Sequence, residues 1–189
     1  MLVSPTALIS ATDADVSIED DRFEPGEVVV GVGERVSWSR GTASTGPHNV
    51  RQDERLFGSG PTTEGSIDYE IRLSAGTFHY FCEAHGSRAG GMDGLIRVPP
   101  TVDPGSPGRR FTVVWATDLT TTGSRFDVQY RRGSHRWLEW KEDTRSTRGV
   151  FGRRGKPERA RDGARYRFRV RSSVGNAASG WSPPATFSV

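Results

Sequence analysis

Ten consecutive residues near the middle of the chain, 99–108, contain four prolines and two glycines. Each proline lacks a backbone N–H and restricts the residue before it, so this stretch is not expected to continue a sheet or a helix. We interpret it as a short, semi-rigid linker. A chain of 189 residues is long for one small β domain and sufficient for two. The sequence therefore predicts two domains that meet near residue 100.

The charge of the chain changes sign at the same place. Residues 1–100 contain 8 Lys and Arg against 15 Asp and Glu, a net charge of −7, whereas residues 101–189 contain 18 against 8, a net charge of +10. This asymmetry indicates two units with different surfaces. The predicted division is an N-terminal tail (1–13), a first domain (14–99), a linker (100–108) and a second domain (109–189).

Short runs of β-forming apolar residues recur in both halves, separated by Gly, Pro, Asp and Ser. No segment keeps a helical period over three turns, so we predict an all-β chain of two β-sandwiches. In the first half the expected strands are 15–18, 27–32, 35–39, 48–51, 66–72, 76–82 and 94–98. In the second half they are 111–116, 125–131, 137–141, 147–151, 166–172 and 185–189.

Cys82 is the only cysteine of the chain, so a disulfide within the chain is ruled out. It belongs to an ordered set that also contains His48, His85 and Met92. Two imidazoles and a thiolate in a trigonal plane, with a weak axial thioether, are the ligands of type 1 copper. Soft sulfur stabilises Cu(I), and imidazole suits both oxidation states. These four residues therefore predict one mononuclear type 1 copper site.

The strand before the cysteine has a regular alternation of faces. Cys82 and Tyr80 are expected on one face, and His79 and Phe81 on the other. His79 is therefore predicted to be a structural or surface residue. His135 lies beyond the linker and is predicted to be the same.

The remaining ligands depend on the loops around this strand. A turn after the cysteine is expected to return His85 to the metal, and a flexible glycine-rich loop, residues 86–91, to return Met92. His48 lies at the start of an earlier predicted strand. Its neighbour Asn49 is expected to connect the two ligand loops by hydrogen bonds.

Residues 14–98 resemble the plastocyanin/azurin-like cupredoxins, which are Greek-key β-sandwiches with one type 1 copper. The loop between His85 and Met92 is longer than in many small members of that family, so Met92 is the ligand that departs most from the family pattern. The resemblance is carried by Phe23-x-Pro25, Val28-Val29-Val30, Gly33-x-x-Val36-x-Trp38, Pro47-His48-Asn49-Val50, Gly76-Thr77-Phe78-His79-Tyr80-Phe81-Cys82-x-x-His85-Gly86 and Gly91-Met92-x-Gly94.

The predicted function is one-electron transfer rather than catalysis. The chain has four histidines and no His-x-His pair, too few for a multicopper oxidase site, and four ligands leave no open position for a substrate. The resemblance implies that the electron passes through His85, where a redox partner protein would dock. The expected rim of this port contains Gly58, Pro61, Ser87 and Ala89.

Acidic residues of the first half have two interpretations. They either steer a basic partner by long-range attraction or only keep the domain soluble. The residues concerned are Asp20, Asp21, Asp53 and Glu54.

The second half resembles a fibronectin type III domain. The resemblance makes Trp115 its core tryptophan and Tyr166 its tyrosine corner, with the hydroxyl bonded to backbone a few residues upstream. It is carried by Trp115, Tyr130, Trp137-x-x-Trp140, Asp162-Gly163-Ala164-Arg165-Tyr166-Arg167-Phe168-Arg169-Val170-Arg171 and Gly180-Trp181-Ser182-Pro183-Pro184.

In the run 166–171, arginines alternate with core residues, so one face of that strand is predicted to be cationic. Such a surface binds an anionic polymer or an acidic protein, docks on the acidic half, or is simply solvated. The aromatic residues are expected in the core or on strand faces, and no nucleic-acid-binding motif accompanies them. The arginines of the strand are Arg167, Arg169 and Arg171, and further basic residues are Arg145, Arg148, Arg153, Arg154, Lys156, Arg159, Arg161 and Arg165.

We therefore expect a monomeric copper-binding electron carrier joined to a basic interaction module. The alternatives are a copper storage or delivery protein, and an extracellular adhesion module whose copper site is structural or vestigial. The two resemblances imply a secreted, periplasmic or cell-envelope location. The opening residues do not look like a signal peptide, and no apolar run approaches the roughly 20 residues of a membrane span.

Overall fold

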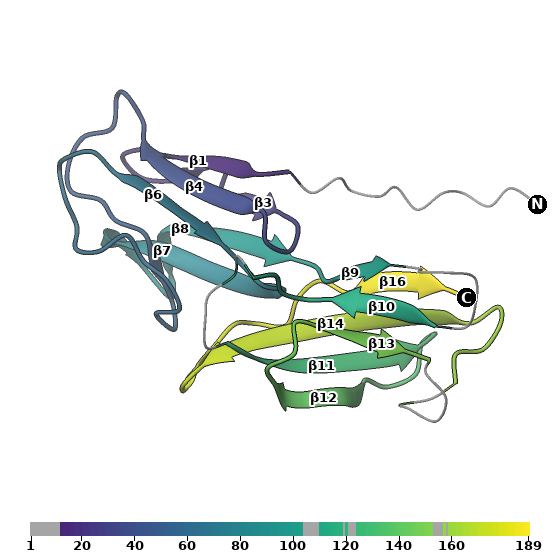
Figure 1. Ribbon diagram of the computed structural model, residues 1–189. Coiled ribbons are helices and arrows are strands. Elements are labelled where there is room, and N and C mark those ends of the chain that lie inside the picture. The colour runs from purple at the N-terminus through teal and green to yellow at the C-terminus, as the bar shows by residue number, and fades with distance from the viewer. Residues whose placement is uncertain (1–11, 104–109, 119, 121–123, 153–156, 158) are drawn as a thin grey trace, which may run out of the picture.

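The computed structural model describes residues 12–103, 110–118, 120, 124–152, 157 and 159–189 (Figure 1). These residues form sixteen strands and no helix, so the predicted all-β fold class is confirmed. It follows that none of them belongs to an apolar helix that could cross a membrane. Parts of three predictions lie outside the described residues: the tail up to residue 11, linker residues 104–108, and the basic residues Arg153, Arg154 and Lys156.

Two four-stranded sheets form the first half, in the orders β2-β1-β4-β6 and β3-β8-β7-β5. Their buried side chains belong to one hydrophobic cluster, so the two sheets face each other across a common core. The strands are β1 (Ala14–Ile18), β2 (Phe23–Glu24), β3 (Glu27–Val29), β4 (Arg35–Arg40), β5 (Arg51–Gln52), β6 (Asp68–Arg72), β7 (Gly76–Ser87) and β8 (Gly90–Val98).

The core of the first half follows from strict alternation along the central strands. In β4, Val36 and Trp38 are buried while their neighbours are not, and β7 alternates in the same way up to Cys82. The ring of Trp38 packs against Tyr69 and Tyr80, with centroids 5.5 and 5.4 Å apart. One aromatic layer therefore fixes the two sheets to each other at Tyr80 of β7, two residues before Cys82.

The second half contains a three-stranded sheet in the order β13-β10-β9 and a sheet in the order β12-β11-β14, with β15 and β16 also paired to β14. Trp115 is fully buried, and the Tyr166 hydroxyl accepts a hydrogen bond from the Arg161 N–H at 3.2 Å. The strands are β9 (Thr101–Asp103), β10 (Phe111–Val114), β11 (Arg125–Arg132), β12 (Leu138–Thr144), β13 (Arg148–Phe151), β14 (Arg165–Val174), β15 (Ala177–Ala178) and β16 (Ala185–Ser188).

One part of the predicted linker is a strand. Thr101–Asp103 form β9 and pair with Thr112–Val114 of β10, so the expectation that this stretch cannot join a sheet is wrong for these three residues. The physical reason is that they lie between Pro100 and Pro104 and keep their own N–H groups. The prolines restrict the flanking positions but not the three residues between them.

Several other strands differ from the predicted ones. The predicted strand 27–32 ends at Val29, so Val30–Val32 lie outside β3. Of the predicted strand 48–51, His48 makes only an isolated bridge with Thr63, and the regular strand is β5. Two short strands, β2 and β15, were not predicted, because a strand of two residues is too short to show a periodic pattern.

The two halves are joined by backbone hydrogen bonds at the start of β7. Thr77 and Gly180 each donate to the other's carbonyl, at N–O distances of 3.1 and 2.8 Å, and the Thr77 hydroxyl donates to the Trp181 carbonyl at 2.8 Å. The Ala75 N–H donates to the Trp115 carbonyl at 2.8 Å. In Figure 1 the second half therefore lies beside the beginning of β7, and the strand leads away from it.

Candidate metal centre

Three predicted ligands meet at one point. The ligand atoms of His48, Cys82 and His85 all lie within 4.8 Å of one another, and the Cys82 Sγ is 3.8 Å from His48 Nδ1 and 3.7 Å from His85 Nδ1. Bonds of about 2.0–2.1 Å to nitrogen and about 2.3 Å to sulfur in a trigonal plane place nitrogen and sulfur about 3.8 Å apart. The three donor atoms are therefore spaced to share one metal ion.

A bulge in β7 brings Cys82 and His85 together. Phe81 pairs with Asp93 and Gly86 pairs with Gly91, so five steps along β7 correspond to only two along β8. The three extra residues bend the strand, which allows two side chains three positions apart to approach the same point. The prediction that Cys82 lies on the buried face is confirmed, because Cys82 is fully buried.

The segment after His85 is a β-hairpin, so the expected flexible loop is wrong. β7 continues to Ser87 and β8 begins at Gly90, with these two residues paired. Gly90 and Gly91 have φ angles of 128° and 103°, which side-chain-bearing residues rarely adopt. The glycines therefore permit a tight turn instead of providing flexibility.

The ring of His48 is held in one orientation. It is fully buried, and its Nε2 lies 2.8 Å from the Thr45 carbonyl oxygen, which can only accept a hydrogen bond. Nε2 therefore carries the proton, and Nδ1 presents its lone pair toward Cys82. Burial lowers the pKa of His48, with a further contribution from the nearby His85, and the hydrogen bond to Thr45 only partly opposes this. His48 is thus kept neutral, as a metal ligand must be.

Asp20 supports this arrangement and was predicted only as a surface acid. Its carboxylate accepts hydrogen bonds from the N–H and hydroxyl of Thr45, and these hydrogen bonds lower the pKa of Asp20. The carboxylate therefore fixes the residue whose carbonyl holds His48. No sequence signal connects residues 20, 45 and 48, because their contact depends on the folded loops.

Asn49 connects the two ligand loops, as predicted. Its amide donates to the Gly60 carbonyl at 2.9 Å and to the Glu83 carboxylate at 2.8 Å, and its Oδ1 accepts the Glu83 N–H at 2.9 Å. Asn49 is fully buried, and Glu83 directly follows Cys82. One side chain therefore fixes the spacing between the segments of His48 and Cys82.

Met92 lies in β8, one residue beyond the partner of Gly86. It is 1% exposed and belongs to the same hydrophobic cluster as Cys82. A Cβ atom added to Gly86 would lie 2.6 Å from the Met92 carbonyl oxygen, so the two strands approach closely just after His85. These positions are compatible with Met92 as axial ligand, which stays a prediction.

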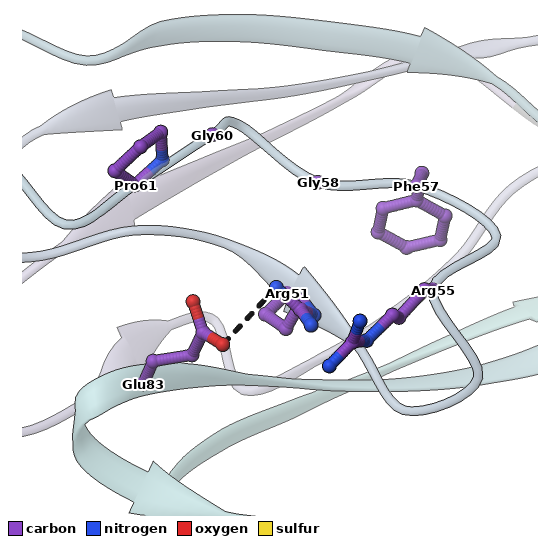
Figure 2. Close-up of a pocket in the computed structure, with 7 residues that line it drawn as sticks. All are labelled: Arg51, Arg55, Phe57, Gly58, Gly60, Pro61 and Glu83. Atoms are coloured by element: carbon purple, nitrogen blue, oxygen red, sulfur yellow. Dashed lines mark ion pairs between the residues drawn. The ribbon is translucent and has the colours of Figure 1, made fainter.

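The surface beside the centre contains a hollow of about 540 Å³ (Figure 2). Arg51 and Glu83 form an ion pair of 3.0 Å at its wall, and the side chain of Arg55 lies beside them. His85 is exposed, whereas His48 and Cys82 are buried. The lining residues include two of the expected rim and five that were not predicted: Gly58, Pro61, Arg51, Arg55, Phe57, Gly60 and Glu83.

His79 points away from the metal centre, as predicted, and lies between two carboxylates. Its Nδ1 is 2.8 Å from Asp53 and its Nε2 is 2.9 Å from Asp93. Arg88 of the hairpin donates to the Asp53 carbonyl and to the Glu54 carboxylate, at 2.7 and 2.6 Å. Two of the acids that were considered for steering a partner are therefore already engaged within the domain.

The contacts of His79 predict a pH-dependent contribution to stability. Burial lowers the pKa of His79, but the hydrogen bonds and charges of Asp53 and Asp93 outweigh it, so the pKa lies above the ordinary value of 6.5. The stabilisation is then fully present below pH 6.5 and is lost as the pH rises through the folded-state pKa. We expect His79→Gln to destabilise the metal-free protein more at pH 5.5 than at pH 8.5, measured by urea denaturation. An equal loss at both pH values would contradict this assignment.

A β-sandwich that gathers two histidines and a cysteine next to one hairpin defines the first half as a cupredoxin domain. A plastocyanin from Scenedesmus fuscus is 35% identical over 88 residues, which cover 40% of this chain and 85% of that protein. The chain therefore belongs to the plastocyanin family through this domain. No protein-family model matches the sequence.

Solved structures resemble a little under half of the chain. A mutant plastocyanin of fern is 22% identical and covers 45% of this chain and 99% of its own, with a TM-score of 0.37. A purple cupredoxin from Nitrosopumilus maritimus is 23% identical and covers 46% of this chain and 99% of its own, also with a TM-score of 0.37.

Proposed function

We propose that this protein is a one-electron carrier that holds a single type 1 copper through His48, Cys82, His85 and Met92. When bound, copper supplies a Cu(I)/Cu(II) couple. The observation that carries the proposal is the meeting of two Nδ1 atoms and one Sγ at a trigonal spacing, with two of the three residues buried. Thiolate and imidazole are donors that suit both valences of copper.

The surrounding residues would keep the ligands in place when the charge of the site changes. His48 is fixed through Thr45, and Asn49 fixes Glu83 beside Cys82. Ligands that are held by the protein move little when an electron arrives, so the barrier to transfer is low. Asn49 and Thr45 are therefore positioning residues rather than ligands.

The exposed edge of the site would be the point of electron exchange. His85 is the exposed member of the cluster, and Gly58, Pro61, Ser87 and Ala89 are also exposed. A redox partner protein would dock over this rim and the adjoining hollow. With four protein ligands around the metal, no position is left for a substrate, which favours electron transfer over catalysis.

The second half would be a fibronectin III-like module that holds the carrier at a partner or surface. The support is its own hydrophobic cluster, to which Ala75 of the first half also contributes, and the Tyr166 hydroxyl contact with the backbone of Arg161. Such an arrangement suits a secreted, periplasmic or cell-envelope protein that acts as a monomer.

The test is a visible absorption and EPR spectrum after one equivalent of Cu(II) is added to the full chain. We expect an intense blue band with narrow copper hyperfine splitting, which Cys82→Ser abolishes and His135→Gln, a change at an exposed histidine of the other half, leaves intact. Met92→Leu should keep the band and change the reduction potential. A pale spectrum that does not change in Cys82→Ser would refute the proposal and favour the adhesion alternative. A blue site with very slow self-exchange would favour storage or delivery.

A further inference from the structure

Five side chains on the outer face of the second half form a continuous stack of guanidinium groups and indole rings. The Cζ of Arg131 lies 4.6 Å from the ring centroid of Trp137, and that of Arg169 lies 4.4 Å from the same ring. Arg169 also lies 4.6 Å from the ring of Trp181, and Arg171 lies 5.1 Å from it. The stack therefore runs Arg131, Trp137, Arg169, Trp181, Arg171, and we call it the Arg–Trp ladder.

The arginines of the ladder lie on β11 and β14, where guanidinium groups without an ion-pair partner are concentrated at one end. Arg171 pairs with Asp127 at 2.7 Å, so that end is neutralised. At the other end Arg131 lies directly opposite Arg167, and like charges in such a pair are destabilising. Among the described residues, no carboxylate forms an ion pair with Arg131, Arg167 or Arg169.

The geometry of the ladder orients its guanidinium groups to bind an anion. Stacking on an indole fixes the plane of a guanidinium while its N–H edges stay free to donate. Arg169 uses one of these donors on Gln129, at 2.8 Å. A fixed guanidinium binds a carboxylate, sulfate or phosphate with two parallel hydrogen bonds, and loses little entropy when it does.

We propose that the Arg–Trp ladder, together with Arg167, binds an extended anionic polysaccharide. Arg167 and Arg169 are two positions apart on one strand, which spaces their charges about 6.6–6.8 Å apart along a sheet face, and this suits a linear chain of charges. Single-stranded nucleic acid is disfavoured because bases need free aromatic faces, and here guanidinium groups lie over Trp137 and Trp181. The proposal concerns the second half only and does not depend on the copper site.

The experiment measures binding of the full chain to heparin at 50 mM salt, with oligodeoxythymidylate of equal charge and anionic phosphatidylserine vesicles as competing occupants. We expect Arg131→Gln/Arg167→Gln to weaken heparin binding about tenfold or more, and to lower the slope of log affinity against log salt. The control Arg148→Gln/Arg159→Gln removes the same charge from exposed positions off the ladder and should change affinity less than about threefold.

The single variant Arg167→Gln provides a second measurement, since the guanidinium of Arg167 is not one of those stacked on Trp137 or Trp181. It is expected to weaken binding severalfold with an unchanged circular dichroism spectrum. Three results would overturn the proposal: no heparin binding by the wild type, equal losses in the ladder and control variants, or tighter binding to oligodeoxythymidylate or vesicles than to heparin.

Discussion

Replacing Trp38 by alanine is expected to lower the free energy of unfolding by about 3–5 kcal/mol, the loss typical of a large aromatic side chain removed from a core. Trp38 is fully buried and packs against Tyr69, Tyr80 and Phe57, with ring centroids 5.4–5.9 Å away. The cavity cannot close easily, because these rings come from three different segments of the first half. Urea denaturation of the metal-free chain, followed by circular dichroism, measures the loss.

The chain offers a matched control for this substitution in Trp137. Trp137 is only partly buried, and its described ring contacts are with two arginine side chains, so Trp137→Ala should cost about 1–2 kcal/mol. A loss of less than about 1 kcal/mol in Trp38→Ala, or equal losses in the two variants, would show that the aromatic layer does not hold the two sheets together.

Asn49→Ala is expected to lower the free energy of unfolding of the metal-free protein by about 2–4 kcal/mol. The amide makes three hydrogen bonds, and its removal leaves the Glu83 N–H, the Glu83 carboxylate and the Gly60 carbonyl without that partner. A buried polar group that loses its partner costs about 1–3 kcal/mol. Urea denaturation again gives the measurement. The control is Asn176→Ala, in an exposed turn, whose free energy of unfolding should stay within about 0.5 kcal/mol of the wild-type value.

The same substitution separates positioning from ligation. If Asn49 only sets the spacing of the ligand loops, Asn49→Ala should still form a blue copper site, but with a shifted absorption maximum and reduction potential. Complete loss of the blue band in a folded variant would instead mean that the spacing is essential for binding. An unchanged spectrum and an unchanged free energy of unfolding would contradict the role assigned to Asn49.

The cluster of His48, Cys82 and His85 could be predicted from the sequence because the chemistry and order of these residues are visible there. Cys82 and His85 are three residues apart, and the alternation up to Cys82 is visible in the sequence as a strand with one apolar face. The all-β class followed from the same alternation. Asn49 could be assigned because it adjoins one ligand and because a buried amide is suited to joining two loops.

Other parts of the site depend on contacts that no local pattern encodes. Asp20 reaches His48 only through Thr45, and the carboxylates around His79 come from two different segments. The sequence predicted a flexible loop after His85 instead of a hairpin, because glycine is common both in flexible loops and in tight turns.

The Arg–Trp ladder could also be predicted only in part from the sequence. The alternation of arginines along β14 was predicted and is present, since Arg167, Arg169 and Arg171 lie between buried residues of that strand. Their stacking on indole rings was not predicted, because Trp137 and Trp181 are distant in sequence and come together only when the sheet forms.

The hydrogen bonds between Thr77 and Gly180 have a consequence for how this carrier would work. Cys82 lies five positions beyond Thr77 on β7, about 16 Å along the strand, so the second half is attached at one end of the domain and the predicted metal ligands lie toward the other. If the second half bound the protein to a surface, His85 would remain accessible to redox partners. The rate of electron exchange would then be limited by diffusion of the partners to the site, rather than by diffusion of this protein.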